Sequence, residues 1–306
     1  MISFNQFVKC MRKEMGKKFQ GRLTIKVEKV EKNNGVVITS LSGKREDNKE
    51  WLSVGLDSYY AAYKEGMDLE QLEADIYDLF NTFEKPGYPL GDLEDFDKVK
   101  DKIFYKLVNY DKNLDTLKEV PHIPYLDLAV VFYVLMERNE KGQSVSVITH
   151  ESRKKWGKDI ESLYEQAKEN TPRLFPVSLC SMGQVMEELI KESNGKEYIG
   201  LGLEDFIKSE KSSPLFVLSN ECGVYGATAM LYQDVLKNFS EMMESDIVIL
   251  PSSVHEILLL PYTMVHDMNE VKETVEHVNR VEVPLTDVLS DHVYLYDRER
   301  NTISII

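Results

Sequence analysis

The stretch Asp246-Ile-Val-Ile-Leu-Pro-Ser-Ser-Val-His-Glu-Ile-Leu-Leu-Leu-Pro261 decides the fold. It contains two apolar runs, Ile247–Leu250 and Ile257–Leu260, with a polar segment between them. Apolar runs of this length are too short for helices and are typical of strands buried on both faces. We therefore expect two strands at the centre of a sheet. Because side chains alternate between the faces of a strand, truncation of either Leu258 or Leu259 should be costly.

The polar segment between the two runs predicts one turn of helix. Ser253 stands three residues before Glu256, which is the spacing of a capping box, in which each side chain bonds the backbone amide of the other residue. The segment also holds the densest polar cluster of the chain, and a site is expected beside it. The side chains concerned are those of Ser252, Ser253, His255 and Glu256.

Composition indicates a soluble globular protein. A chain of 306 residues is long for one hydrophobic core, so two domains are expected. The longest apolar run, Leu128–Met136, has about half the length of a membrane span. The cysteines, Cys10, Cys180 and Cys222, are odd in number and widely spaced, which fits neither a disulfide framework nor a zinc site. These features predict a protein of the reducing cytoplasm.

The net charge of −15 is unfavourable for binding nucleic acid, because neutralising phosphates requires a basic surface. The charge is uneven, since residues 1–34 carry a net +6 and the rest of the chain −21. We expect this basic segment to form a solvated face or to lie against the acidic surface of the same chain. An anionic partner is the alternative.

The N-terminal part of the chain predicts a helix, a small antiparallel sheet and a second helix. Apolar residues recur at helical spacing over residues 2–19 and again over Asp68–Phe83. Between these helices, Leu23–Val27 and Val36–Ile38 alternate with polar residues and predict a hairpin, to which Trp51–Val54 adds a third strand.

The segment Glu84–Asp95 predicts a domain boundary, because prolines, glycines and acidic residues are concentrated there. We therefore expect a subdomain over residues 1–94 and a main domain over residues 95–306.

The main domain begins with a predicted strand at Ile103–Asn109. A strongly apolar segment, Tyr125–Met136, then predicts a hairpin with the alternating strand Ser144–Thr149. A charged amphipathic helix over Ser152–Asn170, closed by Pro172, completes this hairpin-plus-helix unit.

A similar unit is predicted later, with a hairpin of Leu215–Ser219 and Val224–Leu231 followed by a helix over Gln233–Glu244. The remaining expected elements are two helices and a closing hairpin, at Met182–Glu192, Val271–Val278, His292–Tyr296 and Thr302–Ile305. Hairpins that alternate with helices predict an α+β fold with mainly antiparallel sheets.

Three stretches of the sequence resemble those of an uncharacterised bacterial family, a domain of unknown function. They are Asn220-Glu-Cys-Gly-Val-Tyr-Gly-Ala227, Ile249-Leu-Pro-Ser-Ser-Val-His-Glu256 and Val288-Leu-Ser-Asp-His-Val-Tyr-Leu-Tyr-Asp297, and the opening Ile2-Ser-Phe-Asn-Gln-Phe7 is similar too. The resemblance covers nearly the whole chain and implies a bacterial cytosolic protein. It implies no activity, cofactor or catalytic residue.

A nucleotide site is not expected. Gly200 and Gly202 precede a possible helix, but a dinucleotide loop needs a third glycine where Asp205 stands, and its carboxylate would face the pyrophosphate. The chain also lacks a phosphate-binding loop of the Gly-Lys-Ser/Thr type.

A metal site is not expected either. His255-Glu256 begins like a zinc-protease motif, but Leu259 stands where the second histidine ligand belongs. His266 and His277 would lie about 16 Å apart along a helix, too far to share one ion. Only one group of residues converges if the closing hairpin pairs beside the central strands, namely His255, Glu256, Asp291, His292 and Asp297.

The lack of a chemical motif favours a non-catalytic binding or interaction protein. Its partner would be another protein or a small molecule, with no nucleic acid, membrane, metal or cofactor. The alternative is a hydrolase-type enzyme, in which a serine needs a base within hydrogen-bond reach and an acid that orients the base. The candidate residues for that alternative are Ser252, Ser253, His255, Glu256, Asp291 and His292.

Overall fold

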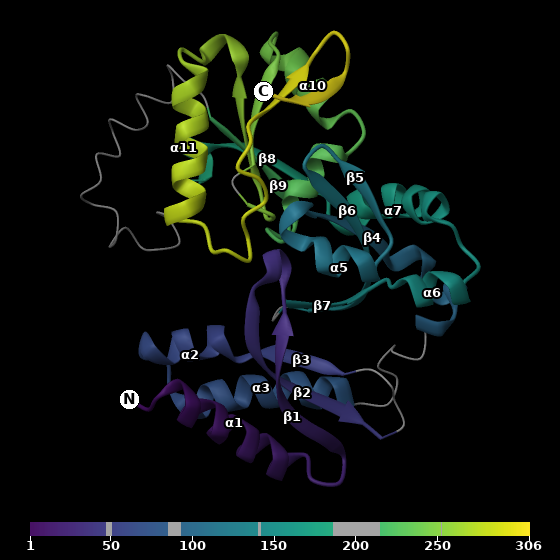
Figure 1. The fold of residues 1–306 in the computed structure, drawn as a ribbon, viewed down its shortest axis with the longest axis vertical. Coiled ribbons are helices and arrows are strands. Elements are labelled where there is room, and N and C mark those ends of the chain that lie inside the picture. The colour runs from purple at the N-terminus through teal and green to yellow at the C-terminus, as the bar shows by residue number, and fades with distance from the viewer. Residues whose placement is uncertain (47–50, 85–92, 140–141, 186–214, 252) are drawn as a thin grey trace. The chain divides into compact units, whose positions relative to one another are not determined.

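The computed structural model describes residues 1–46, 51–84, 93–139, 142–185, 215–251 and 253–306. They form helices and antiparallel sheets, which confirms the predicted α+β class (Figure 1). The chain divides into two compact units, Met1–Val99 and Lys100–Ile306. The boundary after residue 94 stays a prediction. Among the described residues, no helix combines the length and apolar character needed to cross a membrane.

The first unit packs helices against a three-stranded antiparallel sheet in the order β1–β2–β3. At Gly43 in β2, an added Cβ would lie 2.5 Å from the ring of Phe80 on α3, so only glycine leaves room for that ring. The elements of this unit are α1 (Phe4–Lys18), β1 (Leu23–Glu31), β2 (Val37–Arg45), β3 (Leu52–Gly55), α2 (Leu56–Lys64), α3 (Leu69–Glu84) and α4 (Phe96–Val99).

Helix α1 begins with a capping box. The Ser3 hydroxyl accepts a hydrogen bond from the backbone N–H of Gln6, and the Gln6 side chain accepts one from the N–H of Ser3. The apolar face of the helix enters the core of the unit, where Phe7, Met11 and Met15 are fully buried. Its basic side chains remain exposed.

The second unit contains two antiparallel sheets. In the first sheet the strand order is β4–β6–β5 and β7 also pairs with β6, and in the second it is β13–β12–β10–β11–β9–β8. The strands are β4 (Ile103–Asn109), β5 (His122–Tyr125), β6 (Leu128–Asn139), β7 (Gly142–Val147), β8 (Val177–Ser181), β9 (Phe216–Asn220), β10 (Ile247–Leu250), β11 (Ile257–Pro261), β12 (Tyr294–Asp297) and β13 (Thr302–Ile305). The helices are α5 (Leu114–Glu119), α6 (His150–Lys155), α7 (Ile160–Leu174), α10 (Val235–Met243) and α11 (Met268–Val281).

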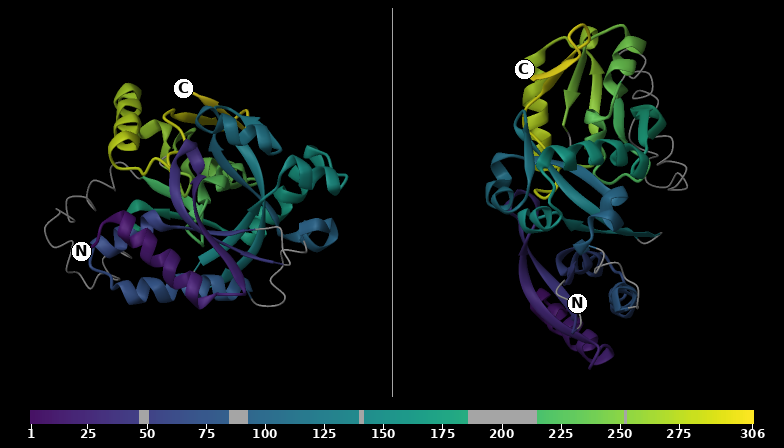
Figure 2. Two further views of the ribbon diagram at one scale, coloured as in Figure 1. Left: turned by 60° about the horizontal axis from the view of Figure 1, so that its bottom comes forward. Right: turned by 90° about the vertical axis from the view of Figure 1, so that its right-hand side faces the viewer.

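The two apolar runs, Ile247–Leu250 and Ile257–Leu260, form β10 and β11, the two middle strands of the six-stranded sheet. Helix α11 covers one face, where Val275 packs with Val248. Helix α10 lies on the other face, where the Phe239 ring meets that of Phe216 at a centroid distance of 5.0 Å. Figures 1 and 2 show the two helices on opposite sides of the sheet. The predicted central, two-sided position of these strands is confirmed.

The two faces are not equally buried. Ile257 and Leu259 of β11, which lie on the α10 side, are fully buried, whereas Leu258 and Leu260 on the α11 side are only partly buried. The prediction that both faces of the strand are buried therefore holds completely on the α10 side and only in part on the α11 side.

Two other elements differ from the sequence prediction. The helix expected over Ser152–Asn170 is broken into α6 and α7, because Gly157 adopts a left-handed φ of 64° and the Asp159 side chain caps a new helix. The expected strand Val224–Leu231 is instead a 3₁₀ helix, η5 (Gly226–Leu231). Its entry residue Tyr225 has a φ of 58°, which a strand does not allow.

The other predicted strands and helices of the second unit are found, including the closing β12–β13 hairpin and α11. Most of the helix predicted over Met182–Glu192, and the Gly200/Gly202 segment, lie outside the described residues.

Leu258 and Leu259 form a matched pair for testing this packing, since they are identical neighbours that face opposite sides of one strand. We expect Leu259→Ala to lower the free energy of unfolding by about 2–5 kcal/mol, because it removes a fully buried side chain and leaves a cavity. Leu258→Ala should cost less, because its side chain is already partly in water. Urea denaturation of both variants measures this, and equal losses would contradict the asymmetric burial.

Candidate functional site

The segments that carry the family resemblance meet in the second unit. The backbone N–H of Ala227 donates to the carbonyl of Val254 (3.3 Å), and the N–H of Val254 donates to the carbonyl of Asp287 (2.7 Å). The hydroxyl of Ser219 donates to the carbonyl of His255 (2.8 Å). The end of β9, the turn before β11 and the loop after α11 are thus joined at one place.

Gly226 stands where these segments approach most closely. A Cβ at this position would collide with the Ser219 hydroxyl and the His255 carbonyl, and would lie 2.8 Å from the backbone nitrogen of Asn220. Two of these three atoms belong to the backbone, so a side chain cannot be accommodated by a rotamer change. Glycine is required here for space and not for its φ angle.

The ring of His255 has a polar partner on each side. Its Nδ1 accepts the backbone N–H of Tyr225 (3.3 Å), so the proton of the neutral ring is on Nε2. Nε2 faces Oδ1 of Asp287 at 3.7 Å, and the two side chains are each about one third exposed (30% and 31%). The ring also stacks on that of Tyr225, with a centroid distance of 5.9 Å and an interplanar angle of 22°.

Behind Tyr225 lies a buried lysine, Lys106 of β4, which is 6% exposed. Its ammonium nitrogen lies 3.4 Å from the ring centroid of Tyr225 and 3.9 Å from that of Tyr133 on β6. Together with His255 and Asp287, these residues form a column that passes from a buried cation to a partly exposed carboxylate. Cation–π attraction is strongest where the charge is desolvated, so the column stabilises the packing between the two sheets.

The electrostatic surroundings favour neutral phenols in this column. Burial raises the pKa of Tyr225, and the nearby charge of Asp287 raises it further. Burial likewise raises the pKa of Tyr133, with a smaller contribution from Tyr225. Both phenols therefore stay protonated at neutral pH.

The helical turn predicted at Ser253 is absent. The segment bends without a helix, although the Ser253 hydroxyl does accept the N–H groups of His255 (3.0 Å) and Glu256 (3.3 Å). The hydroxyl itself donates to Oε1 of Glu256 (2.7 Å), while the backbone N–H of Ser253 donates to the Glu256 carbonyl. The predicted Ser253–Glu256 contact is present, but it closes a turn and caps no helix.

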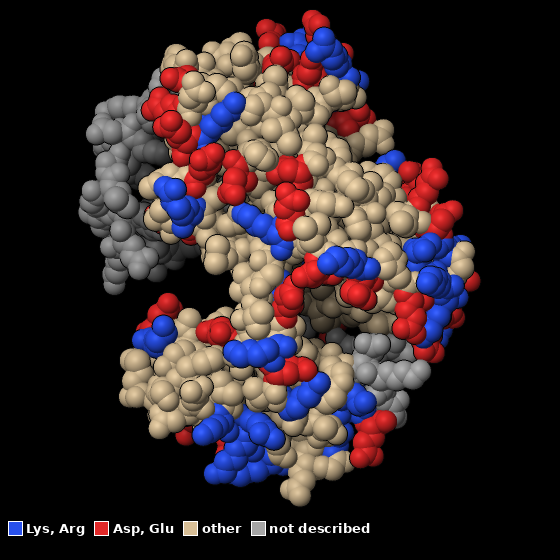
Figure 3. Space-filling view, in the orientation of Figure 1, with Lys and Arg blue, Asp and Glu red and all other residues tan. Residues whose placement is uncertain are grey.

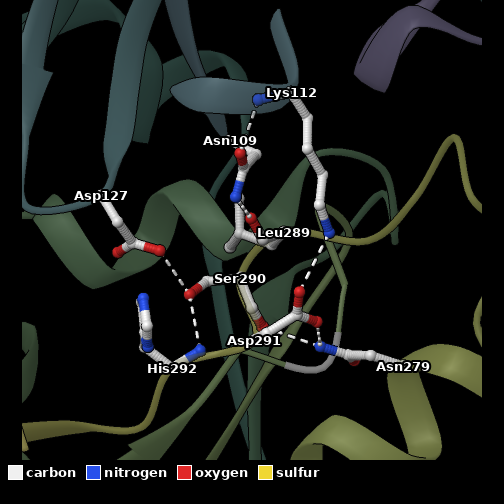
Figure 4. Close-up of polar contacts among 8 residues, drawn as sticks. All are labelled: Asn109, Lys112, Asp127, Asn279, Leu289, Ser290, Asp291 and His292. Carbon is white, nitrogen blue, oxygen red and sulfur yellow. Dashed lines mark hydrogen bonds and ion pairs between the residues drawn. The ribbon is translucent and has the colours of Figure 1, made fainter.

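A second polar cluster holds the loop between α11 and β12 against the first sheet of this unit (Figure 4). The hydroxyl of the fully buried Ser290 donates to Oδ2 of Asp127 (2.6 Å) and accepts the N–H of His292 (2.9 Å). Tyr294 donates its phenol to Oδ1 of the same carboxylate (2.7 Å). Burial raises the pKa of Tyr294, and the charge of Asp127 adds to that rise.

Two buried asparagines hold successive carbonyls of this loop. Asn109, at the end of β4, donates to the carbonyl of Leu289 (3.1 Å). Asn279 of α11 donates to the carbonyl of Ser290 (2.7 Å) and to Oδ1 of Asp291 (3.0 Å). These amides link β4 and α11 through the backbone of one loop.

Asp291 also forms an ion pair with Lys112 (3.1 Å). Partial burial raises the pKa of Asp291, but the hydrogen bond from Asn279, the bond and charge of Lys112 and the charge of His292 together hold that pKa below its usual value.

Apart from Asp297, which pairs with Arg300 (3.0 Å), the described site residues that the sequence predicted fall into these two clusters. Ser253, His255 and Glu256 belong to the first, and Asp291 and His292 to the second. Within the described residues, no bond joins His255 to His292 or the Ser253 hydroxyl to the His255 ring. Ser252 lies outside the described residues, and in the described part no group of three or more His, Cys, Asp or Glu side chains could hold a metal ion.

Sequence reasoning missed Lys106, Tyr225, Asp287 and Asp127. Lys106 carried a usable signal, because it is the one charged residue inside the otherwise apolar β4 segment. The others gave none, since each is an ordinary polar or aromatic residue in a loop whose partners are distant in sequence.

The contact at Gly226 can be tested by Gly226→Ala. We expect the variant to unfold at much lower urea concentration than the wild type, because the added methyl group must displace the His255 backbone. Gly223→Ala provides a control, because nothing lies within 4 Å of a Cβ there, although its φ of 63° adds some strain. A Gly226→Ala protein as stable as Gly223→Ala would contradict the close packing.

Asp291 provides a pH-dependent test of the second cluster. Its lowered pKa in the folded state gives a stabilisation that is present above the unfolded pKa of about 3.9 and is lost as the pH falls through the lower folded value. The difference in unfolding free energy between the wild type and Asp291→Asn should therefore shrink as the pH falls below about 4. Urea denaturation across this range measures it, with Glu299→Gln as an exposed control. A difference that does not vary with pH would contradict the stabilised carboxylate.

Comparison with known proteins is limited to the family level. No curated protein and no solved structure matches the chain. A family model described as Family of unknown function (DUF5688) matches residues 4–298, which confirms the resemblance to an uncharacterised family. Because this match covers most of the 306 residues, the chain belongs to that family of unknown function.

Proposed function

We propose that the protein is a non-catalytic binding or interaction protein, with a recognition surface in the second unit at His255, Asp287 and Tyr225. The observation that carries this proposal is the bonding of His255. Its Nδ1 accepts the Tyr225 amide and its Nε2 faces Asp287, so the neutral ring has no nitrogen left to take a proton from a serine.

The bonding of Ser253 supports the same reading. Its hydroxyl donates to Glu256 and accepts two backbone amides, so all of its hydrogen-bonding capacity is used in holding the turn. A catalytic serine needs instead a bond to a base and an open approach for the substrate. Among the described residues, no contact favours the hydrolase alternative.

The surface offers complementary groups to a ligand. His255 presents an N–H donor, Asp287 a carboxylate acceptor and Tyr225 an aromatic ring, and all three are partly exposed. The close backbone contacts at Gly226 hold these three side chains in fixed positions, so little side-chain entropy is lost on binding. Such a preorganised donor–acceptor pair suits a polar small molecule or a polar segment of a partner protein.

We also propose a bacterial cytosolic location. The three cysteines, Cys10, Cys180 and Cys222, are too few and too widely spaced for a disulfide framework, which fits a reducing compartment. Fractionation of the host cells is the test of this location.

A serine-directed fluorophosphonate probe tests the function proposal. It reacts with serines activated by a base, so we expect no labelling of the peptide that contains Ser252 and Ser253. Mass spectrometry of the digested protein measures this, with a known serine hydrolase as the positive control.

Labelling of that peptide would contradict the proposal if His255→Gln abolished it while the melting temperature stayed unchanged. Asp287→Asn is the second variant to test. It removes the carboxylate that faces His255 and keeps a side chain of the same size as aspartate. Loss of labelling in both variants would establish the hydrolase alternative.

A further inference from the structure

The exposed face of α1 forms a compact basic surface on the first unit. Figure 3 shows Lys and Arg side chains gathered over the region where α1 lies in Figure 1. A shallow hollow on the exposed face of α1 is lined by Lys9, Arg12, Lys13, Gly16, Lys17 and Gln20. These residues share one face because residues three and four apart lie side by side on a helix. Its cations extend over about 12 Å, the rise of the eight residues from Lys9 to Lys17.

The fold gives no reason for the glycine in this hollow. Gly16 lies inside α1, where glycine is less stable than alanine. It has no left-handed φ, and nothing lies within 4 Å of a Cβ built there. The helix therefore gives up stability at Gly16 without gaining packing or a turn. What the glycine does provide is bare backbone beside the row of Lys9, Lys13 and Lys17 and one turn after Arg12.

We propose that this basic face of α1 is a docking surface for an acidic α-helix of a partner protein. Carboxylates at positions three and four apart on the partner helix would meet the cations of α1, which repeat at the same spacing. The bare backbone at Gly16 lets the partner helix approach more closely than a side chain would allow. This surface lies in the first unit and is independent of the His255 surface.

Other anionic partners fit the surface less well. A membrane-binding helix inserts its apolar face into the bilayer, but the apolar face of α1 is already the core of its unit, with Phe7, Met11 and Met15 fully buried. A long nucleic acid needs an extended basic surface, whereas the whole chain has a charge of −15 and this face covers little more than two helical turns. A short acidic helix matches both the size and the charge.

Binding of an alanine-rich helical peptide of about 20 residues, with glutamates three and four apart along one face, tests the proposal. A peptide with glutamine at the same positions is the control. We expect fluorescence anisotropy to show that the full-length protein binds the acidic peptide and does not bind the control peptide. Binding of the acidic peptide should weaken as the salt concentration rises from about 0.05 to 0.3 M. Replacing Lys9, Lys13 and Lys17 by glutamine should weaken binding by about tenfold. Lys237→Gln, an exposed lysine of α10, should leave it unchanged.

Gly16→Gln provides the sharpest variant. Glutamine favours the helix, so the melting temperature should rise or hold, while the added side chain blocks close approach and weakens peptide binding about tenfold. Unchanged binding by Gly16→Gln, or no binding of the acidic peptide to the wild type, would overturn the proposal. It would also be overturned if a labelled DNA duplex or phosphatidylserine vesicles bound this face more tightly than the peptide.

Discussion

The second unit depends on the contact between the backbone of Gly226 and that of His255. Three chain segments reach this point from different strands, and their hydrogen bonds leave no space for a Cβ. The Tyr225 amide bonds the His255 ring there, so one contact sets both the path of the backbone and the tautomer of the imidazole. The candidate recognition surface is therefore built into the fold and is not carried by a loop that could be altered separately.

The loop between α11 and β12 extends this constraint across the unit. At one end Asp287 faces His255 and its carbonyl accepts the Val254 amide. At the other end Ser290 bonds Asp127 of the first sheet, while Asn109 and Asn279 hold the adjacent carbonyls. Ser290, Asn109 and Asn279 are buried, so breaking their bonds would leave polar atoms without water. One loop thus links the first sheet, α11 and the six-stranded sheet.

The same geometry bears on the hydrolase alternative, in which histidine, serine and acidic residues close in sequence would act together. Catalysis by serine needs a ring nitrogen directed at the hydroxyl. In this protein both ring nitrogens of His255 face other groups, and the Ser253 hydroxyl is turned toward Glu256. Proximity in sequence brought the right residue types together, but the turn geometry directs them to structural partners.

Periodicity in the sequence determined the elements whose signal is local. The two apolar runs predicted the central strands β10 and β11, and helical spacing predicted α1, α3 and α11, because an apolar pattern reflects which face of an element is buried. Tertiary structure alone decided the rest. The left-handed Tyr225 turned an expected strand into η5, Leu258 remained partly exposed, and the column from Lys106 to Asp287 joined residues far apart in the chain. These features arise from close packing between distant segments, and a single sequence contains no record of which segments will meet.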